Sequence, residues 1–352
     1  MPRKIHLVGA WPGWSGAQAM ETALERLGPH LLRMTDGETG ERSQWVMPTL
    51  EWLRANPDVE LVRRGDHSDY DHGNRFAVRD GHVFDPANID LSYCRFFQRS
   101  YPAFRELRSR HGLPDVSFQV GCPAPIDLAV DSFGYEAGLG DPQIAEAYAA
   151  ATLREIEAIH AEAGDDVIFQ IETVVSMVAV ARAPEEQQTE VARQMAGAIV
   201  AMVALSPAGT RFGAHLCLGD FHHRALGEMG SARPLVTLAN TLATIWPAEQ
   251  PLEYIHTPFA AAEKPGSLDP AWYEALTDLD LPDGVRFVAG FVHEDFGVEQ
   301  LRQIQAIIER HVGHEVDVAA TCGLGRREDP AQAFDAMDKS LALVGSPVAQ
   351  TR

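Results

Sequence analysis

Residues 167–218 decide the fold, since they begin with VIFQIE (167–172) and end with RFGAHLCL (211–218). Both runs are short and rich in β-branched and aromatic residues, which is typical of buried strands. Between them, apolar residues recur at i, i+3 and i+4 over 187–205, which predicts a helix. A strand, a helix and a second strand form the unit from which parallel sheets are built.

The same alternation extends along the chain in both directions. Further strands are expected at 4–11, 30–36, 117–122, 252–257, 285–292 and 316–322, and further helices at 17–27, 142–163, 234–246 and 298–311. Eight strands alternating with helices predict an α/β fold, the (β/α)₈ TIM barrel. An open doubly wound sheet is the alternative, but GAWPG (9–13) after the first strand lacks the G-x-G-x-x-G spacing of a dinucleotide site.

One connection is much longer than a normal loop of a barrel. Residues 38–116, between the second and third strands, include a predicted helix near 44–55 and another near 101–111. Between these helices, RFAVRDGHVF (75–84) reads as a hairpin that turns at Asp80-Gly81. We expect a single barrel domain over 1–352, with 38–116 as an insertion after the second strand that caps the active site.

Composition excludes several classes of protein. Of the 352 residues, 45% are hydrophobic and 22% charged, which is ordinary for a globular protein and excludes disorder. The net charge of −21 makes nucleic acids and anionic membranes poor partners. No apolar run reaches the roughly 18 residues of a membrane-spanning helix, so a cytoplasmic location is expected. Four cysteines are too few for a disulfide scaffold and favour metal binding or catalysis. The oligomeric state is left open.

The segment His215-Leu216-Cys217 ends the fifth predicted strand. On a strand, residues i and i+2 project to the same side, so this imidazole and this thiol point together into the barrel. His256 and Cys322 end the sixth and eighth strands, which gives four ligands suited to a tetrahedral Zn²⁺. The alternative is a packed strand in which Cys217 is a small buried hydrophobe.

Polar residues at the ends of the second and fourth strands are candidates for substrate binding: Asp36, Glu38, Gln170 and Glu172. A charged side chain after an apolar strand needs a partner, because unpaired burial is costly. A substrate ammonium group is one such partner for Glu38 and Glu172. A salt bridge to Arg42 or Arg75 is the other.

His293 follows the seventh strand and is a candidate general acid or base, although a structural histidine is equally compatible with that position. Other histidines cluster in loops and are expected to be solvated or substrate-facing rather than part of a second metal site: His67, His72, His222 and His223. Cys94 and Cys122 are expected to be structural.

Five segments resemble motifs of the cobalamin-independent methionine synthase family, in the order of that family's zinc-bearing C-terminal barrel. HLCLGDF (215–221) is similar to H-x-C-Y-S-x-F, and ATCGLGRR (320–327) is similar to the C-G-L-K-T-R segment. FQIE (169–172) is similar to I-Q-I-D-E, DGETGER (36–42) to H-G-E-x-E-R, and FVH (291–293) to D-V-H.

The resemblance implies roles for the matching residues. Zinc would be held by His215, Cys217 and Cys322. Glu38 and Glu172 would contact the amino group of homocysteine, and His293 would shuttle a proton.

The sequence also departs from the family. IHT (255–257) stands where the family has I-E-T, so His256 is expected to replace a glutamate ligand. GA (9–10) stands where the family has G-S, so a serine that helps hold the homocysteine carboxylate is missing. An N-terminal barrel like that of the long folate-dependent enzymes is not expected, and some short relatives of the family take the methyl group from a corrinoid protein instead.

The sequence thus predicts a zinc-dependent methyltransferase that activates a small thiol substrate, with a folate or a corrinoid as the methyl donor. Glu172 and His293 are the expected catalytic residues. Three alternatives stay open: a zinc enzyme that opens an epoxide with a thiol, a non-catalytic zinc- or thiol-binding barrel, and a metal-free decarboxylase on a related barrel. The last would leave His215 and Cys217 without a role.

Overall fold

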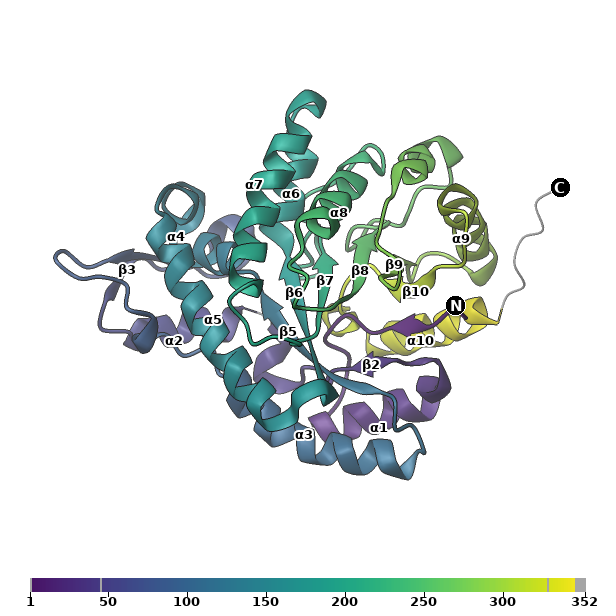
Figure 1. Ribbon diagram of the computed structural model, residues 1–352, viewed down its shortest axis with the longest axis horizontal. Helices are drawn as coiled ribbons and strands as arrows, with labels where there is room; N and C mark the ends of the chain where they lie inside the picture. Colours follow the sequence, from purple (N-terminus) through teal and green to yellow (C-terminus); the bar gives the residue numbers. More distant parts are fainter. Residues whose placement is uncertain (1, 45, 328, 346–352) are drawn as a thin grey trace.

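The computed structural model describes residues 2–44, 46–327 and 329–345 (Figure 1). Its strands are β1 (Ile5–His6), β2 (Arg33–Met34), β3 (Val59–Arg63), β4 (Arg75–Val78), β5 (Ser117–Pro123), β6 (Val167–Thr173), β7 (Phe212–Leu216), β8 (Leu252–Pro258), β9 (Arg286–Val292) and β10 (Asp317–Ala320). Its α-helices are α1 (Gly16–Leu27), α2 (Met47–Trp52), α3 (Tyr93–Arg110), α4 (Pro125–Gly140), α5 (Pro142–Ala163), α6 (Val174–Arg182), α7 (Glu185–Val203), α8 (Arg233–Ile245), α9 (Val298–Val312) and α10 (Pro330–Val344).

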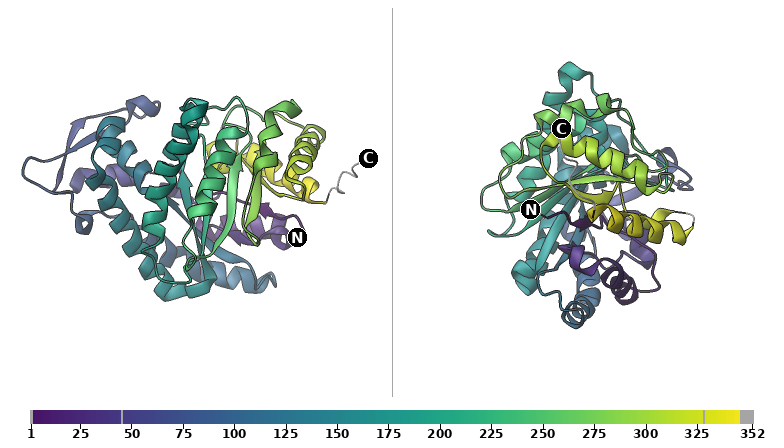
Figure 2. Two further views of the ribbon diagram at one scale, coloured as in Figure 1. Left: turned by 45° about the horizontal axis from the view of Figure 1, so that its top comes forward. Right: turned by 90° about the vertical axis from the view of Figure 1, so that its right-hand side faces the viewer.

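The main sheet is parallel and closes on itself. Its strand order is β1-β10-β9-β8-β7-β6-β5-β2, and a parallel bridge between Ile5 and Leu31 joins its two edges. Helices surround the strands, and the N-terminal strand lies beside α10 (Figures 1 and 2). The structure therefore confirms the predicted (β/α)₈ barrel.

Local sequence signals explain where the helices begin. Asp141 accepts a hydrogen bond from the backbone N–H of Gln143 at the start of α5, and Pro142 occupies the first helical position. Asp329 and Pro330 repeat this arrangement at α10. Each cap satisfies a backbone N–H that has no partner within the helix.

The strands β1 and β2 are much shorter than the predicted 4–11 and 30–36. Beyond His6, side chains rather than a neighbouring strand satisfy the backbone carbonyls. The Gln119 side-chain amide donates to the carbonyls of Leu7 and Val8, and the Thr35 hydroxyl donates to that of Gly9. The chain is thus free to turn away from the sheet at the seam of the barrel.

A polar layer lies inside the barrel. The Tyr254 hydroxyl donates to the side-chain oxygens of Gln119 and Gln170, and His6 contacts the same Gln170 oxygen. All four side chains are buried. This network leaves Gln170 held from several sides, so its side chain is fixed.

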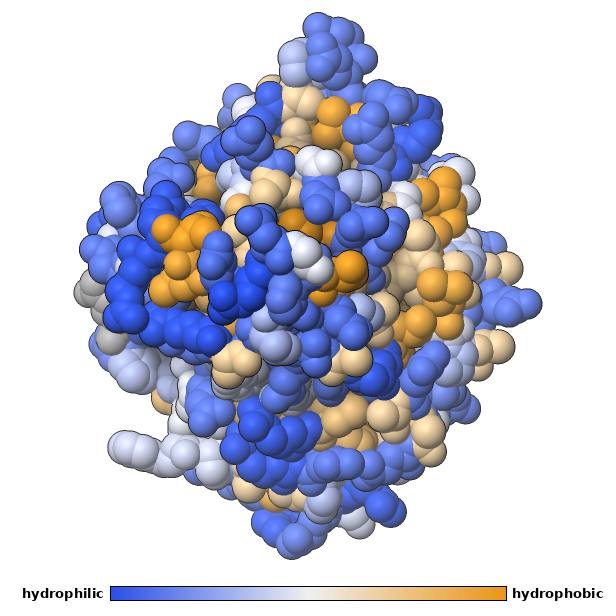
Figure 3. Space-filling model, turned by 90° about the vertical axis from the view of Figure 1, so that its left-hand side faces the viewer, coloured by the Kyte–Doolittle hydropathy of each residue, from blue (hydrophilic) through white to orange (hydrophobic). Residues whose placement is uncertain are grey.

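The connection between β2 and β5 contains α2, α3 and a separate antiparallel pair, β3 with β4. The predicted hairpin within 75–84 is wrong, because Arg75–Val78 pairs with Val59–Arg63 upstream rather than with the residues after Asp80-Gly81. This pair projects at one end of the molecule (Figures 1 and 2). On the face at that end, apolar patches are separated by hydrophilic side chains (Figure 3).

A search of the described helices for a membrane span finds none that is both long and apolar enough.

Candidate metal and substrate site

Three side chains meet at the carboxyl ends of β7 and β10. His215 lies on β7, Cys217 follows that strand, and Cys322 follows β10. Their ligand atoms all lie within 4.8 Å of one another, and all three residues are buried. The two sulfurs are 3.8 Å apart, and Cys322 Sγ is 3.9 Å from His215 Nε2. One imidazole and two thiols are a donor set that suits Zn²⁺.

The surroundings favour the neutral forms of His215 and Cys217 in the absence of a cation. Contact with the Cys322 thiol, together with burial, raises the pKa of Cys217 well above its ordinary value. Burial and the neighbouring His256 lower the pKa of His215, so its ring is neutral and keeps a lone pair for a metal ion. These three side chains therefore fit the zinc ion that the sequence predicts.

His256 does not belong to this group of three. It lies on β8 opposite His215 in the register, and its Nδ1 is 2.8 Å from His215 Nδ1. Its other nitrogen, Nε2, is 3.0 Å from the carbonyl oxygen of Ala320. Both ring nitrogens of His256 are thus engaged in contacts with the protein. The sequence-based prediction instead has one of them bound to the metal.

The four predicted substrate-binding residues separate into two pairs. Glu38 and Glu172 line the main pocket beside the three candidate ligands, whereas Asp36 and Gln170 are not among its lining residues. Gln170 Nε2 donates to Glu172 Oε1 at 3.0 Å. Asp36 accepts from the backbone N–H of Glu38 and from Ser100. Asp36 and Gln170 therefore hold the two glutamates in place.

The carboxylates of Glu38 and Glu172 converge over Gly121. A Cβ atom at this position would lie 2.7 Å from Glu172 Oε1 and 2.9 Å from Glu38 Oε1, so any larger residue there would displace the two carboxylates. Arg42 donates to Glu38 at 3.2 Å, which is one of the two salt bridges that the sequence offered. Burial raises the pKa of Glu38 to about 8; Arg42 opposes this change, and the charge of Glu172 adds to it.

The second predicted salt-bridge partner, Arg75, is used differently. Its guanidinium donates to the backbone carbonyls of Asn74 and Asp131. Arg75 and Asp131 both line the pocket, and burial raises the pKa of the Asp131 carboxyl to about 7.

His293 is buried and is not among the residues that line the pocket. Its Nε2 lies 2.9 Å from the carbonyl oxygen of Ala262, and its Nδ1 accepts from the backbone N–H of Asp295. Burial lowers the pKa of His293, although the adjacent Glu294 opposes this effect.

The loop histidines have separate partners. His223 contacts Asp220 and Glu294, which raise its pKa to about 9. His72 pairs with Asp69, and His222 lies 2.9 Å from the carbonyl oxygen of His67. His67 itself lines the pocket, and its Nε2 is buried with no hydrogen-bond partner in the described part of the chain.

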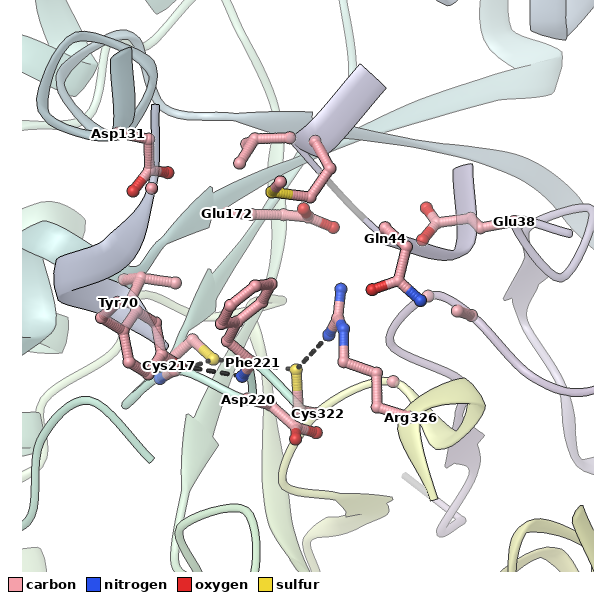
Figure 4. A pocket seen from close by; sticks show the side chains of 18 of the residues that line it. Glu38, Gln44, Tyr70, Asp131, Glu172, Cys217, Asp220, Phe221, Cys322 and Arg326 are labelled. Atoms are coloured by element: carbon pink, nitrogen blue, oxygen red, sulfur yellow. Dashed lines mark hydrogen bonds between the residues drawn. The ribbon is translucent and has the colours of Figure 1, made fainter. Parts of the chain in front are cut away.

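Some pocket residues were not singled out from the sequence. The Tyr70 hydroxyl accepts from the backbone N–H of Phe221 and donates to the carbonyl of Arg224, so the β2–β5 connection is fastened to the loop after Cys217. Arg326 contacts Cys322 Sγ at 3.9 Å. Figure 4 shows both cysteines with Arg326, and the two glutamates along another side of the pocket. Arg326 follows the ATC motif by four residues, but no spacing rule marks it.

The pocket leaves a volume of about 90 Å³ for the centres of water-sized molecules. Part of its lining is apolar, supplied by Val46, Met47, Leu50, Val174 and Phe221. The site thus combines a soft donor set, two carboxylates and apolar walls.

Solved structures of other proteins share this fold along nearly the whole chain. A candidate vitamin-B12-independent methionine synthase from Listeria monocytogenes has a TM-score of 0.58, with 14% identity over 98% of both chains. A B12-independent methionine synthase from Shewanella sp. W3-18-1, solved with selenomethionine, also scores 0.58, with 11% identity over 97% of both chains. A methyltransferase from Methanosarcina mazei scores 0.50, with 16% identity over 96% of this chain and 94% of that one.

No family model matches the sequence, and no curated protein matches it significantly. At these identities the likeness concerns the fold. It agrees with the methionine synthase-like family to which the sequence motifs pointed.

Proposed function

We propose that this protein is a zinc-dependent methyltransferase that methylates a small thiol bearing an amino group. The observation that carries the proposal is the His215, Cys217 and Cys322 group in the wall of a pocket that also contains Glu38 and Glu172. The folds of the Listeria, Shewanella and Methanosarcina proteins support the methyltransferase class.

The number of protein ligands favours a catalytic site over a structural one. Structural zinc sites have four protein ligands, whereas catalytic sites keep one position for water or substrate. Here three side chains form the group, and both nitrogens of His256 are engaged elsewhere. Bound zinc would act as a Lewis acid that lowers the pKa of a substrate thiol.

The protein's own residues would orient the thiol substrate. Glu38 and Glu172 would bind its ammonium group. Two buried carboxylates beside each other are costly, and the ammonium group would form an ion pair with them. Gln170 and Asp36 would keep these carboxylates in position through the hydrogen bonds described above. The Shewanella structure contains selenomethionine, an amino acid with a methylated chalcogen, which is consistent with an amine-bearing thiol as substrate.

For the proton of the leaving group we propose His293, as the sequence predicted. Its bond to the carbonyl of Ala262 would have to be exchanged when the donor binds. We also propose that residues 38–116 act as a cap, because Tyr70 fastens them to the loop after Cys217. The donor, a folate or a corrinoid, stays a prediction.

Metal content tests the zinc site. We expect about one zinc per chain in the wild type, as for a single site, and its loss in Cys217→Ser and in Cys322→Ser. Cys94→Ser is the matched control, since this thiol contacts the carbonyl of Glu155 on the outside of the barrel. Wild-type protein that takes up no zinc even after reconstitution contradicts the proposal.

Two simple thiols then test the substrate class. In cobalt-substituted protein, 2-mercaptoethylamine should change the visible spectrum at lower concentration than 2-mercaptoethanol. Glu172→Gln should abolish this preference and keep the metal. Equal responses to both thiols in the wild type would overturn the role of the two glutamates. Methyltetrahydrofolate and methylcobalamin are the donors to test for thioether formation.

A further inference from the structure

His256 is a polar residue beside the candidate metal ligand His215, and the proposed mechanism gives it no role. Its side chain is fully buried on β8, and its ring lies 4.7 Å from that of His215 between centroids, tilted by 50°. Its Nδ1 is 2.8 Å from His215 Nδ1, and its Nε2 is 3.0 Å from the carbonyl oxygen of Ala320.

These two contacts determine which nitrogens carry protons. A carbonyl oxygen only accepts, so His256 Nε2 carries a hydrogen. The ring is neutral, because a fully buried imidazolium would be costly and neither partner carries a negative charge. His256 Nδ1 is therefore an acceptor, and His215 must donate to it from Nδ1. The lone pair of His215 is then on Nε2, the nitrogen that faces Cys322 Sγ at 3.9 Å.

We infer that His256 is a positioning residue, which holds His215 in the tautomer and orientation that present Nε2 to the metal beside Cys217 and Cys322. The inference rests on the proposed metal site. Ligating histidines usually donate their other N–H to an acceptor that fixes the ring, and here a second histidine supplies that acceptor.

Two features of the fold restrain the His256 ring at Nε2. Ala320 stands two residues before Cys322, so the carbonyl that binds His256 belongs to the same strand end as a candidate ligand. At the same nitrogen, a Cβ atom at Gly290 would lie 2.5 Å from His256 Nε2. Glycine at this position of β9 therefore makes room for the ring where both bonds can form.

Nitrogen NMR of the metal-free protein tests the tautomers directly. With ¹⁵N-labelled histidine rings, His215 should show a protonated Nδ1, and His256 a protonated Nε2. In His256→Phe, which keeps an aromatic ring but loses both bonds, His215 should change to the Nε2–H form that free histidine prefers. His256→Gln keeps a donor and an acceptor and should retain the wild-type tautomer of His215.

Zinc binding gives the second readout. His256→Phe should weaken zinc affinity about ten- to hundredfold, as is typical when the partner of a ligating histidine is removed. His256→Gln should restore most of it. Gly290→Ala, which displaces the ring without changing its chemistry, should resemble His256→Phe. This second variant keeps the test valid if His256→Phe does not fold.

X-ray absorption of the zinc-loaded wild type separates positioning from ligation. One imidazole per zinc is expected, whereas two would make His256 a ligand and overturn the inference while leaving the proposed function intact. A protonated Nε2 on His215 in the wild type would also overturn it. If the wild type binds no zinc, the proposed function fails, and the NMR result still decides the tautomers.

Discussion

Replacing Glu38 by glutamine should remove a large pH dependence from the stability of the protein. The Glu38 side chain is buried beside Glu172, and burial raises its pKa from 4.5 to about 8. Glutamine has nearly the same shape, and its side-chain oxygen can still accept the hydrogen bond from Arg42 Nη2 that Glu38 accepts at 3.2 Å. The substitution therefore removes the titration with little change in packing.

The direction of this pH dependence follows from the pKa of Glu38 in the unfolded chain and in the folded chain. Below pH 4.5 the carboxyl is protonated in both the folded and the unfolded chain, so its full contribution to stability is present. Between pH 4.5 and 8 the unfolded chain loses this proton while the folded chain keeps it, and the wild type loses about 1.4 kcal/mol per pH unit. Across this interval the loss amounts to about 5 kcal/mol, and above pH 8 it stays constant.

Urea unfolding at several pH values, with metal chelated in every sample, measures this effect. The difference in unfolding free energy between Glu38→Gln and the wild type cancels the titration of all other groups. It should rise in favour of the variant from pH 4.5 to 8 and be flat on either side. Glu41→Gln, a substitution at an exposed neighbour, is the matched control. Parallel stability curves for Glu38→Gln and the wild type would refute the reasoning.

Three further substitutions test other parts of the site. Gly121→Ala should displace both pocket carboxylates and leave the zinc content unchanged. The KM for an amine-bearing thiol should rise about tenfold, which corresponds to about 1.4 kcal/mol. A normal KM would contradict the placement of the carboxylates. His223→Asn should cost about 2 kcal/mol near pH 6, allowing for partial solvent screening. This loss should disappear in urea unfolding above pH 9, because the raised pKa of His223 stabilises the fold only while the ring is protonated. Tyr70→Phe leaves a backbone N–H without its acceptor and should cost about 1 kcal/mol, seen as faster amide hydrogen exchange confined to 219–227.

The barrel could be predicted from the sequence because its strands are buried on both faces. Strands such as Val167–Thr173 and Arg286–Val292 are rich in β-branched and aromatic residues and almost entirely buried, and their observed bounds lie within one or two residues of those expected. The hairpin at 75–84 failed for the opposite reason. Asp80-Gly81 is a strong local turn signal, but strand pairing depends on which segment lies alongside, and Val59–Arg63 provides the better neighbour.

The group of His215, Cys217 and Cys322 also shows what a local sequence pattern can and cannot predict. The alternation of a strand places His215 and Cys217 on one side, and the structure brings both to Cys322. That pattern gives the side of a strand but not the height of a residue along the barrel axis. His256 is in register with His215 rather than with Cys217, so it lies beside His215. If a metal binds at His215, Cys217 and Cys322 as proposed, the departure of this sequence from the methionine synthase motif would convert a ligand position into a supporting one, and one coordination position would be left for the substrate.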